Sequence, residues 1–141
     1  MTRTLSVEEE IQRPADEVWE RLTDWDNASK WMPGVESMAA DGETTTGTKL
    51  AFRARGGERS SAIVHCDSGT SIVLRSVQGG VTADYRYEVL DIDGRSTRVT
   101  LVADCHIEGL WLRLVSPLIR IAIRSTDGKQ LKLLKAMIEG A

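Results

Sequence analysis

The sequence has few residues that could cross-link the chain or hold a metal. It contains 2 cysteines and 2 histidines among 141 residues. Two cysteines are too few for a disulfide framework or a cysteine-rich zinc site, so Cys66 and Cys105 are predicted to be free thiols and no metal is expected. Only 3 prolines are present, and no repeat or Pro/Gly-rich linker divides the chain. We therefore expect a single domain over residues 1–141, a length that supports one sizeable core.

The chain also lacks an excess of positive charge and a long apolar run. Its net charge is -3, which disfavours nucleic acid as a partner because no net positive field displaces phosphate counterions. No apolar run reaches the length of about 18 residues that a membrane span needs. The N-terminal residues lack the apolar region of a signal peptide. We expect a cytoplasmic protein without a transmembrane segment.

Three motifs of nucleotide binding and nucleophilic catalysis are absent. The sequence contains no GxGxxG, no GxxxxGK[ST] and no GxSxG pattern. Dinucleotide-binding, P-loop and nucleophile-elbow functions are therefore disfavoured, and no cofactor is expected.

The apolar pattern predicts a strand, two short helices and then six more strands. Leu5, Val7, Glu9 and Ile11 alternate along the first strand. Pro14 ends that strand and opens a helix, and a second short helix stops at residues 33–34. The period then changes to two, and turn residues separate strands predicted near 35–40, 47–55, 58–67, 70–78, 81–91 and 96–107. Such short connections indicate an antiparallel meander.

Alternation assigns a face in some strands and not in others. Tyr85 and Tyr87 lie on the predicted inner face of their strand. In the strand near 58–67, either Ile63 or Val64 could point inward, and in the strand near 70–78 the same holds for Val73 and Leu74. Which side of each strand faces the interior therefore stays open.

After Gly109 the period returns to that of a helix. One predicted inward stripe comprises Val115, Leu118, Ile119, Ala122, Thr126, Gln130, Leu133 and Met137. The polar residues 125–128 interrupt it, and they either split the helix or make it thin where it crosses a cavity. We favour the second interpretation. A curved sheet with a long helix across it would bury both apolar faces, which is an α+β architecture.

Several segments along nearly the whole chain resemble one superfamily. They are Ile11–Trp19, Leu22–Asp24, Trp31–Val35, Tyr87–Val89, Thr97–Leu101 and Leu131–Ile138. The sequence resembles the START-like, Bet v 1-like helix-grip superfamily (SRPBCC), and within it the bacterial polyketide cyclase/dehydrase-type proteins. This resemblance implies a curved seven-stranded antiparallel sheet in the order 1-7-6-5-4-3-2, wrapped around a long C-terminal helix, with two short helices between strands 1 and 2. It also implies a hydrophobic cavity between the sheet and that helix.

We therefore expect the domain to bind a small hydrophobic or polycyclic ligand, with polyketide cyclase/dehydrase-like activity as one reading. A non-catalytic carrier or sensor of a lipid-like ligand is the alternative. A protein-interaction module, including a homodimer, is a third, because the segment from Leu110 to Ile123 has more apolar residues than one stripe can bury. Whether the protein is an enzyme stays open.

Candidate ligand-binding residues follow from these expectations. They are Trp31, Met32, Phe52, Tyr85, Tyr87, Leu101, Leu118 and Ala122. Glu9, Tyr85 and Tyr87 are the candidates for proton transfer, because a carboxylate and two hydroxyls on an inner face could reach a ligand. The alternatives are a strand-end or salt-bridged Glu9, tyrosines that only pack in the core, and a tryptophan that only packs a small helix.

Two further clusters have plainer explanations. His65-Cys66-Asp67 and Asp104-Cys105-His106 suggest a metal site or a Cys-His pair. The implied sheet order separates their strands by two others, roughly 14 Å, so we disfavour this use. Arg53, Arg55 and Arg59 surround a Gly-Gly turn, which is typical of a solvated hairpin tip, with an anionic partner as the alternative.

Overall fold

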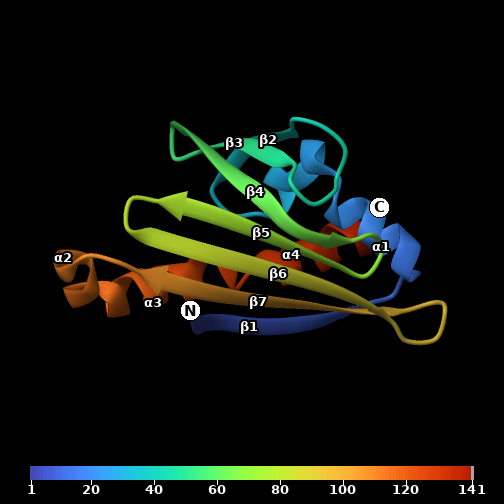
Figure 1. Ribbon diagram of the computed structural model, residues 1–141. Coiled ribbons are helices and arrows are strands. Elements are labelled where there is room, and N and C mark those ends of the chain that lie inside the picture. Colours follow the sequence, from blue (N-terminus) through green and yellow to red (C-terminus); the bar gives the residue numbers. More distant parts are fainter. Residues whose placement is uncertain (141) are drawn as a thin grey trace.

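Seven antiparallel strands form one curved sheet in the computed structural model, which describes residues 1–140 (Figure 1). The strand order is β1-β7-β6-β5-β4-β3-β2, so the first strand pairs with the last. This order confirms the predicted helix-grip fold. The strands are β1 (Thr2–Ile11), β2 (Val35–Ala40), β3 (Lys49–Ala54), β4 (Gly57–Asp67), β5 (Ser71–Gln78), β6 (Val81–Asp91) and β7 (Thr97–Ile107).

Short helices follow β1, and a series of helices follows β7. The first two are α1 (Ala15–Leu22) and the 3-10 helix η1 (Trp25–Lys30); the others are α2 (Leu110–Leu114), α3 (Ser116–Asp127) and α4 (Gln130–Glu139). In Figure 1, α3 and α4 run behind β5, β6 and β7. Helix α4 buries Leu131, Leu134 and Ile138. Within residues 1–140, no helix is both long enough and apolar enough to span a membrane.

The C-terminal helix is interrupted, contrary to the interpretation we favoured from the sequence. Gly128 and Lys129 separate α3 from α4 with near-helical backbone angles (φ -63° and -91°), so the chain keeps its direction while the helix ends and restarts. The inward side keeps a helical spacing across this interruption: Ile119, Ile123 and Asp127 line the cavity, and Leu134 and Ile138 are buried. The predicted stripe is wrong at Leu133, which is exposed, because Leu134 is the residue in phase with this inward side.

A β-bulge explains why the facing of residues 58–67 stays open from the sequence. The register between β4 and β5 shifts between Ile63 and His65, so Val64 is the extra residue. A bulge reverses the alternation, because one added residue moves every later side chain to the other face. Ile63 is therefore fully buried, and Cys66 also packs against the core beyond the bulge.

The core lies between the sheet and the helices, with η1 closing one end. Trp31, just after η1, is fully buried and meets Tyr87 of β6 edge-to-face, with ring centroids 5.8 Å apart and planes at 86°. Pairs of this geometry stabilise a core beyond their buried area. This contact attaches η1 to the sheet beside the site described below.

The β5–β6 turn packs tightly against the start of α2 at Gly80. A Cβ at this position would contact the Glu108 carbonyl oxygen and lie 2.7 Å from Leu112 Cδ1. We expect Gly80→Ala to lower the free energy of unfolding by about 1–3 kcal/mol, the usual cost of overpacking. Chemical denaturation measures this change. Gly42→Ala is the matched control, because nothing lies within 4 Å of its Cβ position; equal effects at the two sites would contradict the prediction.

Candidate functional site

A cavity of about 460 Å³ lies between the inner face of the sheet and helix α3. Its walls are largely apolar, with side chains from β2, β3, β5 and α3 that include Met38, Phe52, Leu74, Ile119 and Ile123. This volume falls within the usual range of small-molecule sites, about 300–1,000 Å³. A pocket of this size therefore lies where the resemblance implies a cavity.

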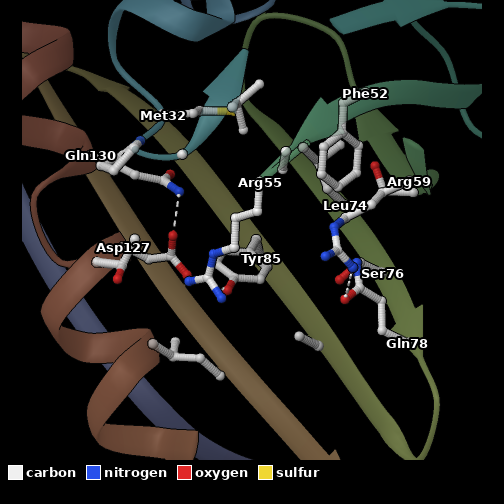
Figure 2. Close-up of a pocket in the computed structure, with 18 of the residues that line it drawn as sticks. Met32, Phe52, Arg55, Arg59, Leu74, Ser76, Gln78, Tyr85, Asp127 and Gln130 are labelled. Carbon is white, nitrogen blue, oxygen red and sulfur yellow. Dashed lines mark hydrogen bonds between the residues drawn. The ribbon is translucent and has the colours of Figure 1, made fainter. Parts of the chain in front are cut away.

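Four polar side chains form a connected cluster in the cavity wall. Figure 2 labels three of them, Tyr85, Asp127 and Gln130. Tyr85 Oη donates a hydrogen bond to Asp127 Oδ2 at 2.5 Å, and Tyr87 Oη donates to Gln130 Oε1 at 2.5 Å. Gln130 Nε2 then donates to Asp127 Oδ1 at 3.2 Å. The end of α3 and the start of α4 supply the acceptors, and β6 supplies the tyrosines. Each Asp127 oxygen therefore accepts one bond and keeps a free lone pair.

Burial controls the protonation of this cluster. It raises the pKa of Asp127 above the ordinary aspartate range, while the bonds from Tyr85 and Gln130 and the charge of Arg55 oppose the rise. Burial, followed by the charge of Asp127, also raises the pKa of both Tyr85 and Tyr87 far above the usual tyrosine range. Both tyrosines therefore stay protonated at neutral pH and donate hydrogen bonds, whereas burial changes how readily the Asp127 carboxylate takes up a proton.

Two arginines lie at the other side of the cavity. Arg59 Nη1 donates to Gln78 Oε1 at 2.6 Å. Arg55 extends from the β3–β4 turn towards Asp127 and Tyr85 (Figure 2). Its backbone is left-handed, with φ 53°, a conformation that residues other than Gly, Asn and Asp rarely adopt. The site therefore combines a desolvated carboxylate with a guanidinium held in a strained turn.

The structure distributes the predicted ligand-binding residues between the cavity and the core. Met32, Phe52, Tyr85, Tyr87 and Ala122 line the cavity. Trp31 and Leu101 are fully buried and do not belong to its lining.

Leu118 points away from the sheet, with 68% of its surface exposed. The prediction that Leu118 faces inward is wrong, because the inner side of α3 carries Ile119, Ala122, Ile123 and Thr126 instead. Ile123, which the sequence pattern placed outside the stripe, is therefore part of the wall.

Glu9 lies apart from the tyrosine cluster. It is half-buried on β1 and borders a separate shallow depression with Lys132, Lys135 and Glu139. Lys135 pairs with Glu139 at 2.8 Å, and within residues 1–140 Glu9 forms no salt bridge. Glu9 is therefore outside the cavity without being the salt-bridged residue weighed as an alternative.

The two Cys/His triplets do not meet. Strands β5 and β6 lie between β4, which carries Cys66, and β7, which carries Cys105. Burial raises the pKa of the Cys66 thiol, and the charge of Asp67 adds to the rise, so its reactive thiolate form is disfavoured.

Sequence reasoning missed Asp127, Gln130 and Arg55 as site residues. Asp127 belongs to the polar break at residues 125–128, and Gln130 belongs to the predicted inward stripe of the helix; these were the available signals. For Arg55 the signal was an arginine before glycine in a two-residue turn, where Asn-Gly is the usual pair.

Comparisons with known proteins agree with this architecture. Residues 2–139 match the family model described as "Polyketide cyclase / dehydrase and lipid transport". No curated protein matches the chain. Among solved structures, the Zhui aromatase/cyclase from Streptomyces sp. R1128 is similar with a TM-score of 0.77 and 15% identity, covering 96% of this chain and 92% of that one.

Two further structures have the same fold. A START superfamily protein from Mycobacterium smegmatis has a TM-score of 0.75 at 14% identity, with 96% of this chain and 97% of that chain covered. Norcoclaurine synthase from Thalictrum flavum, in complex with dopamine and hydroxybenzaldehyde, has a TM-score of 0.70 at 16% identity, with 96% and 86% covered. Because the family model matches nearly the whole length of the chain, the chain belongs to the polyketide cyclase/dehydrase and lipid transport family.

Proposed function

We propose that this protein binds a small, largely apolar ligand that carries carbonyl groups, and that it catalyses the cyclisation and dehydration of that ligand. The observation that carries the proposal is the Asp127 carboxylate, which lies in the wall of an apolar cavity and is oriented by Tyr85 and Gln130. A desolvated carboxylate with a raised pKa is suited to general-base catalysis. The family match supports the same class of reaction.

The proposed reaction begins with proton abstraction. Asp127 removes a proton from a carbon next to a ketone, and the Arg55 guanidinium stabilises the negative charge on the resulting enolate oxygen. The enolate carbon attacks a second carbonyl of the same molecule, which forms a C–C bond and an alkoxide. The alkoxide takes the proton held by Asp127, which gives a hydroxyl group and restores the carboxylate. Asp127 then removes a second α-proton as a C=C bond forms, and it gives that proton to the departing hydroxide, so water leaves. The steps are redox-neutral and release one molecule of water overall, so no cofactor is needed.

The apolar walls of the cavity contribute by folding the substrate. A flexible polyketone held against Phe52, Leu74 and Ile123 has fewer conformations available than it has in water. Positioning of this kind lowers the barrier to an intramolecular step.

A non-catalytic carrier is the second candidate, and one observation favours it. Both tyrosine hydroxyls donate within the cluster, and each Asp127 oxygen already accepts one hydrogen bond there. A connected network of this kind could serve only to stabilise the wall of a cavity that holds a lipid-like ligand intact.

Incubation with a linear polyketone, presented as its N-acetylcysteamine thioester, distinguishes these functions. Mass spectrometry should show loss of one water, and absorbance should show a new conjugated ring, at a rate above that of buffer alone. Native mass spectrometry on the same samples reports binding. A stoichiometric complex that releases the polyketone unchanged would favour the carrier and contradict the enzyme.

A further inference from the structure

Helices α2 and α3 expose large apolar side chains on the side away from the sheet. We call Leu110, Trp111, Leu114, Leu118 and Ile121 the α2–α3 apolar face. Between 53% and 82% of the surface of each is exposed. In Figure 1 these helices lie at one end of the sheet, with α2 projecting beyond it. Monomeric proteins rarely leave so much adjacent apolar surface in water without a partner that covers it.

The charge around this face has one sign. From Gly109 to Thr126 the sequence carries Arg113, Arg120 and Arg124 and no acidic residue, although the chain as a whole has a net charge of -3. Arg113 and Arg124 are exposed, whereas Arg120 is partly buried and donates to Thr4 Oγ1 at 2.6 Å. The face is thus apolar and basic on a protein that is acidic elsewhere.

Two acidic residues lie close to the segment. Glu108 lies 3.2 Å from His106, measured from Oε1 to Nε2, and Asp104 lies 3.9 Å from Arg3. Neither carboxylate forms a salt bridge with Arg113 or Arg124, and the three arginines outnumber the single adjacent Glu108.

We propose that the α2–α3 apolar face docks reversibly on an anionic lipid membrane surface. Helices that lie in a membrane interface combine exposed Leu and Trp with basic residues, and they bind by apolar burial together with attraction to anionic headgroups. Both features are present here. A symmetric contact with a second copy would instead bring the arginines of the two copies together, which costs energy.

The position of α3 gives this docking a consequence for the cavity. The outer side of α3 carries Leu118 and Ile121, while its inner side lines the cavity with Ile119 and Ile123. A membrane contacting the outer side would therefore lie one helix away from the cavity. Docking itself does not depend on whether the ligand is carried or transformed.

Co-sedimentation with lipid vesicles tests the proposal on the full chain. We expect binding to vesicles of phosphatidylcholine mixed with phosphatidylglycerol, little binding to phosphatidylcholine alone, and weakening as salt is raised. The fluorescence of Trp111 should shift to the blue on binding. That shift should disappear in Trp111→Phe, because Trp25 and Trp31 are already buried and Trp19 is partly buried against the core.

Two double variants and two matched controls locate the surface. Arg113→Glu with Arg124→Glu, and Trp111→Ser with Leu114→Ser, should each weaken binding to the mixed vesicles by about tenfold or more. Arg86→Glu with Arg95→Glu, and Leu90→Ser with Ile92→Ser, change exposed residues elsewhere and should leave binding unchanged. Thermal melting verifies that all four variants fold.

Three results would overturn the proposal. They are equal binding to neutral and mixed vesicles, no binding to either, and controls that weaken binding as much as the test variants. A dimer in sedimentation velocity that only the α2–α3 variants dissociate, without vesicle binding, would assign the face to a second copy of the chain.

Discussion

Replacing Asp127 by asparagine is expected to lower the turnover of a linear polyketone by about 10²- to 10⁴-fold, the usual contribution of a general base. Asparagine keeps the shape of the side chain and can still accept from Tyr85, but it cannot take up a proton. Binding of the polyketone should change far less than turnover, because the apolar walls are untouched. Steady-state kinetics therefore should show the loss in kcat rather than in KM.

A matched control separates this effect from a general loss of carboxylate charge. Asp104 is a partly buried aspartate of β7 that does not belong to the cavity lining. Asp104→Asn should retain full turnover. Unchanged turnover in Asp127→Asn would remove Asp127 as the base and leave the carrier as the better account of the cavity.

The same substitution should change how stability depends on pH. Burial raises the pKa of Asp127 above its value in the unfolded chain, so the folded state binds this proton more tightly. Above the unfolded value of about 3.9, the free energy of unfolding therefore falls as pH rises through the raised folded pKa. Asp127→Asn removes this contribution. Denaturation at several pH values should show the stability of wild type relative to the variant decreasing as pH increases, and a constant difference would contradict the assignment.

The strands and the inward tyrosines could be predicted because local patterns determine them. Alternation in β6 places Tyr85 and Tyr87 on one face, and both line the cavity. The order of the strands and the place of the cavity were expected for a different reason, because they followed from a resemblance that extends along nearly the whole chain. By contrast, the bulge at Val64 is one extra residue in a ladder, and periodicity alone does not reveal which of two adjacent apolar residues is displaced.

The polar half of the site was harder to predict because tertiary contacts give its residues their roles. Asp127 and Gln130 resemble a polar gap in a helix until β6 brings two hydroxyls to them. Leu118 and Leu133 were misplaced because each is followed by an apolar residue, Ile119 and Leu134, that faces inward, and periodicity alone does not reveal that the inward side is centred on the later residue. The sequence around Arg55 is typical of a solvated hairpin tip, and the pattern does not reveal that this tip borders the cavity.

Replacing Arg55 by asparagine should stabilise the fold while weakening the binding of acidic ligands. Arg55 and Gly56 connect Ala54 to Gly57, which pair directly, and both have positive φ (53° and 74°). Asn-Gly is the preferred sequence for such a turn, so we expect the free energy of unfolding to rise by about 0.5–1 kcal/mol. The lost charge-assisted contact should lower affinity for an anion by about 10- to 100-fold.

Two fluorescent probes separate the effect of the guanidinium charge on ligand binding from its effect on stability. Anilinonaphthalene sulfonate is anionic, whereas N-phenyl-1-naphthylamine has the same aromatic frame without the sulfonate. Arg55→Asn should weaken only the first, and Arg55→Lys should restore part of its affinity. Arg53→Asn is the matched control, because Arg53 pairs with Glu36 at 3.2 Å and does not line the cavity.

Since the charge of Arg55 lowers the pKa of Asp127, Arg55→Asn should also move the acidic limb of the turnover profile to higher pH. A less stable variant with unchanged sulfonate affinity would show that the strained arginine serves the turn and not the ligand.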